Sequence, residues 1–143
     1  MDKRVRNRIV LLVEDSDDDA FFFERALANA AGEAVLQRFP DGGAAINYLA
    51  QLSTNSPDLS SYVVFLDLKL PVLSGFEVLK WIRERGLSLE VIILSGSDLD
   101  SDVDAARELG ASRFIVKPIS SVQLRERLDD VVAGAVAGAT QGA

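Results

Sequence analysis

Short runs of branched hydrophobic residues recur along the chain and predict strands that are buried on both faces of a sheet. The clearest runs are Ile9–Val13, Tyr62–Leu66 and Leu89–Leu94. Arg113–Val116 is a shorter run of the same kind, and Ala34–Phe39 is the most weakly patterned, as is typical of an edge strand. The pattern therefore predicts five strands.

Between these runs the hydrophobic period changes to that of a helix. Five stripes have this spacing: Ala20, Phe23, Leu27 and Ala30; Ala45, Ile46 and Leu49; Phe76, Leu79 and Ile82; Val103, Ala106 and Leu109; Leu124, Leu128 and Val131. The acids Asp17–Asp19 suit a helix N-terminus, and Gly86 and Gly110 suit positions just past a helix end. The polar segment Leu52–Ser61 predicts a long surface loop.

Strands and helices thus alternate, which predicts a parallel sheet with helices on both faces. We expect an α/β, flavodoxin-like, doubly wound sheet of five parallel strands in the order 2-1-3-4-5, with five helices. Residues 8–132 would form this one domain. Residues 133–143 are small and weakly patterned and predict a flexible C-terminal tail.

Reactive side chains follow four of the predicted strands at their carboxyl ends. Glu14 and Asp15 follow the first strand, Asp67 follows the third, Ser95 the fourth and Lys117 the fifth. Each residue alone is usually a loop residue, a helix cap or a solvated surface charge. In the order 2-1-3-4-5 these four strands are neighbours, however, so all five side chains are expected to converge on one crevice.

Three clustered carboxylates need a compensating charge, because two of them about 4 Å apart repel by about 4 kcal/mol at an effective dielectric of about 20. All available ligands are oxygens, since the chain has no cysteine and no histidine. A hard cation such as Mg²⁺, or Mn²⁺ in its place, fits such a site. Mg²⁺ suggests phosphoryl chemistry, with Asp67 as the nucleophile, Glu14 and Asp15 at the metal, and Lys117 and Ser95 at the phosphoryl oxygens.

Composition narrows the function further. The 143 residues suit one domain, and the net charge of −7 argues against direct DNA binding, because phosphates attract basic surfaces. No hydrophobic stretch approaches the length of a membrane span, so we expect a cytoplasmic protein. Without histidine, any phosphohistidine that takes part must belong to another protein.

Four motifs together resemble the response-regulator receiver domain of two-component systems. They are LLVEDSDDD, LDLKLPVLSG around Asp67, LSGS at Ser95 and FIVKP at Lys117, and the resemblance covers nearly the whole chain. It implies that a histidine kinase or histidine phosphotransfer protein phosphorylates Asp67. It also implies that Mg²⁺ is bound by Asp15, by Asp67, by the backbone carbonyl of Lys69 and, through water, by Glu14.

The resemblance also implies a switch. Ser95 would move toward the phosphoryl group, Phe114 would swing inward, and the peptide before Pro118 would be cis. The protein would catalyse only its own phosphorylation and dephosphorylation, and would act on a downstream protein target. The DLKLP segment and the long Leu52–Ser61 loop resemble stand-alone regulators that often serve phytochrome-type histidine kinases. A homodimer is one assembly that such a protein could form.

Three other functions are weighed against this one. A phosphatase or dehalogenase with an aspartate nucleophile would need an acid at the position of Lys69 and room for a cap domain. A flavin-binding electron carrier would need a phosphate loop where this chain has EDSDDD, which would repel phosphate. A degenerate receiver would lack key residues that are all present here.

Phe21, Phe22 and Phe23 are consecutive on the first predicted helix. Successive helical side chains are about 100° apart, so the three cannot all face the sheet. Phe23 fits the inward stripe, and at least one of the other two should be exposed. That residue either packs beside the last helix or forms a hydrophobic docking site for the kinase.

Overall fold

Five parallel strands form one sheet in the order β2-β1-β3-β4-β5. The structure, a computed structural model, describes residues 8–30, 33–56, 58–96 and 100–141 of the 143, and for 134–141 it describes the backbone alone. The strands are β1 (Arg8–Val13), β2 (Ala34–Phe39), β3 (Tyr62–Leu66), β4 (Glu90–Ser95) and β5 (Arg113–Val116). This topology confirms the predicted strand order and fold class. Two strands differ slightly from the prediction: β1 begins one residue earlier, at Arg8, and β4 is shifted by one residue at both ends, to Glu90–Ser95.

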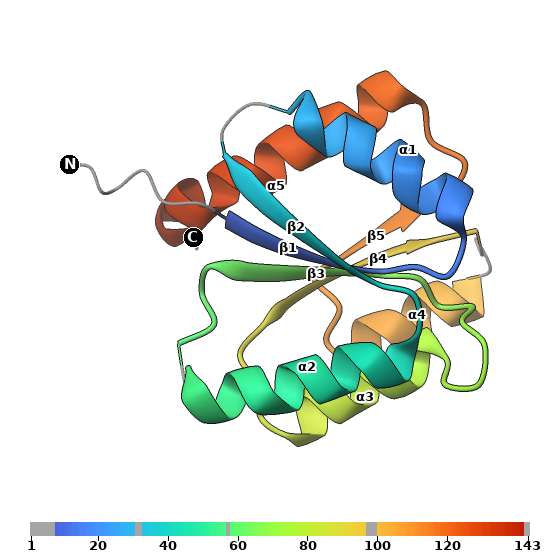
Figure 1. Ribbon diagram of the computed structural model, residues 1–143, viewed down its shortest axis with the longest axis vertical. Helices are drawn as coiled ribbons and strands as arrows, with labels where there is room; N and C mark the ends of the chain where they lie inside the picture. Colours follow the sequence, from blue (N-terminus) through green and yellow to red (C-terminus); the bar gives the residue numbers. More distant parts are fainter. Residues whose placement is uncertain (1–7, 31–32, 57, 97–99, 142–143) are drawn as a thin grey trace.

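Helices cover both faces of the sheet (Figure 1). Helices α1 (Asp17–Ala28) and α5 (Ser121–Gln141) lie on one face, and α2 (Gly42–Asn55), α3 (Gly75–Glu84) and α4 (Asp100–Glu108) lie on the other. The strands therefore bury side chains on both sides, in two separate hydrophobic cores. The predicted helical stripes supply much of both cores, including Phe23, Leu49, Leu79, Ala106 and Leu124.

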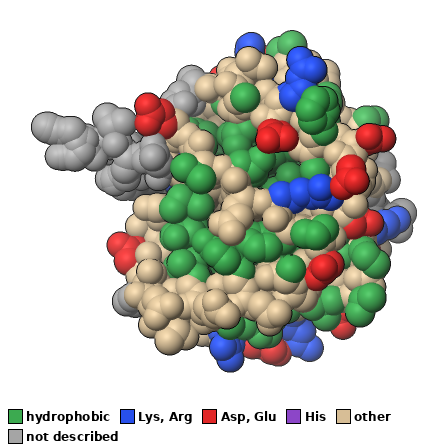
Figure 2. Space-filling model, viewed as in Figure 1, with side chains coloured by type: hydrophobic (Ala, Val, Ile, Leu, Met, Phe, Trp, Pro, Cys, Tyr) green, Lys and Arg blue, Asp and Glu red, His purple; other side chains and the backbone are tan. Residues whose placement is uncertain are grey.

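Strand β2 is an edge strand, as its weak pattern predicts. Its residues alternate in burial, and Val35 keeps half of its side-chain surface exposed. Figure 2 shows hydrophobic side chains gathered over this edge of the sheet, between the α1 layer and α2. The central strands β1 and β3, by contrast, are buried along nearly their whole length.

The helices begin at residues that satisfy their free backbone N–H groups. The Ser16 side chain accepts a hydrogen bond from the backbone N–H of Asp19 at the start of α1. Ser74 and Glu77 form a reciprocal capping box at the start of α3. Gly86 and Gly110 follow α3 and α4 with positive φ angles of 70° and 93°, where other residues would be strained.

The predicted loop over Leu52–Ser61 is wrong in its first part. Helix α2 continues to Asn55, because the hydroxyls of Ser53 and Thr54 donate back to the carbonyl of Ala50 and so fit the helix. Leu59, within the remaining loop, is buried. At the other end of the chain, the backbone of α5 is helical to Gln141, and the flexibility of residues 133–143 stays a prediction.

Candidate functional site

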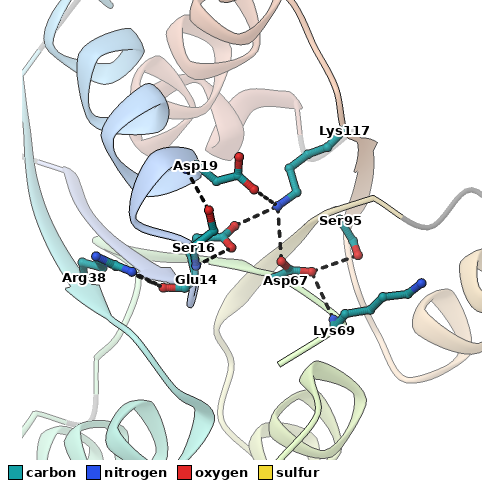
Figure 3. A network of polar contacts seen from close by, with 8 residues as sticks. All are labelled: Glu14, Ser16, Asp19, Arg38, Asp67, Lys69, Ser95 and Lys117. Atoms are coloured by element: carbon teal, nitrogen blue, oxygen red, sulfur yellow. Dashed lines mark hydrogen bonds and ion pairs between the residues drawn. The ribbon is translucent and has the colours of Figure 1, made fainter. Parts of the chain in front are cut away.

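Four strands bring their carboxyl ends to one crevice (Figure 3). Glu14 and Asp67 directly follow β1 and β3, Ser95 ends β4, and Lys117 directly follows β5. Strand pairing continues into the site. The backbone N–H of Asp67 donates to the carbonyl of Val13 at 3.1 Å, and that of Lys117 donates to the carbonyl of Ser95 at 2.8 Å. These bonds place the side chains from rigid elements.

Lys117 lies at the centre of the acidic groups. Its Nζ donates to Glu14 Oε1 at 2.9 Å, to Asp19 Oδ2 at 2.8 Å and to Asp67 Oδ2 at 3.2 Å. One ammonium group thus serves three carboxylates that come from β1, α1 and β3. It has no donor left for a further acid in this arrangement, because an ammonium has three N–H groups.

Asp67 is buried, and both of its carboxylate oxygens are engaged. Oδ1 accepts from the Ser95 hydroxyl at 3.0 Å and from the backbone N–H of Lys69 at 3.1 Å, while Oδ2 faces Lys117. Ser95 is fully buried, and the hydrogen bond to Asp67 occupies its hydroxyl. The carboxylate is therefore held in one orientation at the base of the crevice.

Glu14, Asp15 and Asp67 form a candidate metal centre. One carboxylate oxygen of each lies within 4.8 Å of the others. Glu14 and Asp67 are buried and Asp15 is exposed, so the cluster opens to solvent on the side of Asp15. All three donors are hard oxygens, which fits Mg²⁺ or Mn²⁺ and does not suit a soft metal.

The electrostatics of the crevice are dominated by burial and excess acid. Burial raises the pKa of Glu14 above its ordinary value; hydrogen bonding to Lys117 opposes this, and the charge of Asp67 adds to it. Burial alone would lower the pKa of Lys117, but its hydrogen bonds to Asp19 and Glu14 and the charge of Asp67 raise it overall. Lys117 is therefore a permanent cation, while Glu14 resists ionisation in the absence of a further positive charge.

Two of the predicted residues lie apart from these groups or contribute differently. Phe114 is half-buried on the face of the sheet that α2, α3 and α4 cover, and it packs against the hydrophobic core there. Lys69 lines the crevice with an exposed side chain, and its backbone N–H holds Asp67. The peptide between Lys117 and Pro118 is cis, as the resemblance implied.

Sequence reasoning missed two members of the site. Asp19 was read only as a helix N-terminal acid, but it reaches Lys117 from the first turn of α1. Its place in the first turn of the helix that follows Glu14 and Asp15 was the available signal. Arg38, near the end of β2, donates twice to the carbonyl of Glu14, at 3.0 and 2.8 Å. A basic residue at the carboxyl end of a strand beside β1 was the signal there.

The crevice extends from the carboxylates to a hydrophobic wall. Its volume is about 570 Å³, within the range of small-molecule sites, and its lining includes the hydrophobic side chains of Phe22, Pro118 and Ile119 besides Asp67. Phe22 also lines a groove between α1 and α5, together with Phe21 and Val122. Exposed fractions of 58% for Phe21 and 40% for Phe22 confirm the prediction that this helix carries an exposed phenylalanine.

None of the helices described is long and hydrophobic enough to cross a membrane. The cytoplasmic location stays a prediction.

Comparison with known proteins shows which family has a similar sequence. The family model described as the response regulator receiver domain matches residues 10–129. A probable methanogenesis regulatory protein, FilR2 of Methanothrix harundinacea, is 31% identical over 86% of this chain and 80% of its own length. The two-component response regulator ORR41 of Oryza sativa subsp. japonica is 30% identical over 80% of this chain and 87% of its own.

Solved structures agree with this assignment. The Mn²⁺-bound form of response regulator Rcp1 superposes with a TM-score of 0.73 at 30% identity, covering 88% of this chain and 92% of that one. The phosphorylated cyanobacterial phytochrome response regulator RcpA gives a TM-score of 0.76 at 27% identity, covering 93% and 96%. Each of the two superpositions covers nearly all of this chain and nearly all of the solved structure.

Proposed function

The chain belongs to the response regulator receiver family, and from that premise we propose that Asp67 accepts a phosphoryl group from a partner's phosphohistidine. The position of the Asp67 carboxylate carries the proposal. It is buried between the Lys117 ammonium and the Ser95 hydroxyl, at the base of a crevice that is open to a donor. A carboxylate in this position can act as a nucleophile. The ammonium and the hydroxyl beside it can pair with the negatively charged oxygens of the phosphoryl group after transfer.

The transfer is a displacement at phosphorus. A carboxylate oxygen of Asp67 forms the new P–O bond while the P–N bond to the imidazole breaks, and the electron pair of that bond stays on the nitrogen. The ring leaves as neutral imidazole when its other nitrogen carries a proton. Lys117, already cationic, pairs with the phosphoryl oxygens, and the hydroxyl of Ser95 donates to one of them.

Glu14, Asp15 and Asp67 would hold Mg²⁺ or Mn²⁺, with the Lys69 carbonyl as a further ligand. Support comes from the all-oxygen donor set and from the excess of acid over base, since Lys117 alone faces three carboxylates. When bound, the ion supplies neutralising charge to the oxygens of the transferred group. The Mn²⁺-bound structure of the related Rcp1 supports the same class of ion.

A small-molecule phosphoryl donor tests the site without a kinase. Wild-type protein incubated with acetyl phosphate and Mg²⁺ should gain one phosphoryl group by intact-mass measurement, and Asp67→Asn should gain none. The matched control is Asp58→Asn, which changes an exposed acid in the loop before β3 and should label like wild type. Equal labelling of the Asp67 variant would remove Asp67 from this role.

We further propose that the groove between α1 and α5 receives the helices that carry the donor histidine. Phe21, Phe22 and Val122 expose 58%, 40% and 55% of their surface along this groove. Phe22 lines both the groove and the crevice, so a helix seated on it lies next to Asp67. Exposed hydrophobic side chains grouped in this way mark a contact surface. The similarity to RcpA favours a phytochrome-type histidine kinase as donor.

Replacing Phe22 with serine separates docking from chemistry. Transfer from a cognate kinase should slow at least several-fold, whereas labelling by acetyl phosphate, which needs no docking surface, should hardly change. Val35→Ser, on the exposed edge of β2, is the control for loss of an exposed hydrophobic residue and should leave both rates unchanged. If the two rates of the Phe22 variant fall together, the side chain supports the core; if neither falls, the kinase binds elsewhere.

Phosphorylation is proposed to switch contacts with a downstream protein. Ser95 and Phe114 would carry the change, because Ser95 touches Asp67 while Phe114 pairs across from Ile93 on the neighbouring strand. The chain would act on no substrate beyond its own phosphoryl group.

A further inference from the structure

We propose that Arg38 is a positioning residue for the metal centre. Its guanidinium would fix the turn from which Glu14 and Asp15 extend. The inference rests on the proposed metal-binding function and assigns a role to a residue outside the acidic cluster. Figure 3 shows Arg38 approaching Glu14 from β2, on the side away from Lys117.

Three hydrogen bonds define the arrangement. Arg38 Nε and Nη2 donate to the backbone carbonyl of Glu14 at 3.0 and 2.8 Å, and Nη1 donates to Asp17 Oδ1 at 2.8 Å. The Arg38 side chain is only 28% exposed, so water competes weakly for the two bonds to the carbonyl. The guanidinium therefore joins β2 to both ends of the segment that links β1 to α1.

The Glu14 carbonyl lies where the pairing of β1 with β2 ends. The last paired residues are Val13 and Phe39, and the backbone N–H of Glu14 still donates to the carbonyl of Phe39. Beyond this point the chain turns toward α1. The carbonyl of Glu14 is bound by the side chain of Arg38 and no longer by the backbone of β2. Two N–H groups of the planar guanidinium converge on this one carbonyl oxygen and restrain both its distance and its direction, which the compact ammonium of a lysine does less well.

Fixing this backbone matters because Glu14 and Asp15 both extend from it. A cation with strict geometry binds more tightly when its carboxylates start from a fixed backbone, since less freedom is lost on binding. Groups that orient metal ligands typically change metal affinity by about ten- to a hundredfold when they are removed. Arg38 also engages Asp17, but that carboxylate is 92% exposed, so this ion pair is expected to contribute little.

The test measures the Mn²⁺ affinity of the full chain by calorimetry, below the unfolding temperature of each variant. Arg38→Ala should raise the dissociation constant about tenfold, and Arg38→Lys should raise it by a smaller factor. Asp17→Asn should stay within twofold of wild type. Arg107→Ala is the matched control, because it removes an arginine whose partner is one exposed aspartate, Asp104, and it too should stay within twofold.

A second readout separates positioning from general damage. If Arg38 only positions the metal ligands, the labelling rate of Arg38→Ala by acetyl phosphate should approach that of wild type at saturating Mn²⁺. An Arg38→Ala affinity within twofold of wild type, with Asp15→Ala abolishing binding, would refute the proposal and leave the metal site intact. Should Arg38→Ala unfold, the same twofold criterion applied to Arg38→Lys decides. Absence of binding in wild type would refute the metal site itself, and this inference with it.

Discussion

The two ends of the sheet hold charged side chains in different proportions. At the carboxyl end, three carboxylates share the one ammonium of Lys117, and Asp15 adds a fourth acid beside them. At the amino end, among the residues that the structure describes, the buried guanidinium of Arg8 pairs with one carboxylate, that of Glu90. The same kinds of group are thus balanced at one end and strongly unbalanced at the other.

This difference in charge balance distinguishes the Arg8–Glu90 pair, which is structural, from the candidate site around Lys117. The Arg8–Glu90 pair has its charge compensated within the described part of the fold, although Arg8 Nε is buried without a hydrogen-bond partner. At the carboxyl end two buried acids, Glu14 and Asp67, share the ammonium of Lys117 with the half-exposed Asp19. This excess of acid raises the free energy of the folded protein and favours binding of a cation or redistribution of charge. The stoichiometry of charge, more than burial or residue type, is therefore what makes the carboxyl end the candidate functional site.

The largest expected effect comes from removing the shared cation. Lys117→Ala should still bind Mg²⁺, because the acids remain, but the protein should no longer respond when a phosphoryl mimic binds. The lysine is useful once a phosphoryl group is there to pair with. Amide NMR shifts measure this, and those of Ser95 and Phe114 should lose most of their response. A wild-type shift pattern in the variant would show that the response of the crevice to a phosphoryl group does not depend on Lys117.

Breaking the balanced pair should act on stability alone. Arg8→Ala is expected to lower the free energy of unfolding by about 3 kcal/mol, near the low end for a buried pair, because Glu90 keeps 31% of its side chain exposed. Urea unfolding measures this. Mn²⁺ affinity should stay unchanged, as Arg8 lies at the opposite end of the sheet. A loss below about 1 kcal/mol would place this pair with ordinary surface ion pairs.

The carboxyl end could be predicted from sequence because strand order determines which residues meet there. Once β1, β3, β4 and β5 are neighbours, Glu14, Asp67, Ser95 and Lys117 must converge, whatever their detailed contacts. The hydrophobic pattern shows that strands and helices alternate, and the rules for such chains then give parallel strands and their expected order. The cis peptide at Pro118 was expected from the resemblance, and the structure has it.

Contacts that depend on side-chain direction were out of reach. The predicted first strand begins at Ile9, and nothing in its pattern indicates that the side chain of Arg8 reaches Glu90 across β3. Asp19 and Arg38 were missed because their roles depend on where α1 begins and where β2 ends relative to β1. The end of α2 was misplaced because Ser53 and Thr54 are tolerated in a helix when their hydroxyls bond back to it.

The smallest expected effect is a change in stability when one glutamate at each end of the sheet is replaced by glutamine. This comparison tests the charge balance of the two ends most directly. Glu14→Gln should raise the free energy of unfolding at neutral pH without metal. Burial raises the pKa of Glu14 in the folded protein, so the fold favours its neutral form. Wild type then loses stability as pH rises from the unfolded pKa through the folded one, and the glutamine variant does not. The advantage of the variant should be absent below about pH 4.5 and should grow toward neutral pH.

Glu90→Gln should have the opposite sign, because it leaves the buried guanidinium of Arg8 without its counter-charge. Both variants keep the shape of the side chain, so differences in packing are small and the sign reports charge balance. Calorimetric unfolding at pH 4 and pH 7, with a chelator present, should separate the two. Mg²⁺ adds a second contrast: it should stabilise wild type and Glu90→Gln equally, and Glu14→Gln less, because that variant has lost an acid of the metal centre. If both substitutions destabilise the protein at pH 7, the crevice is balanced by groups other than Lys117, and its excess of acid does not explain a need for a cation.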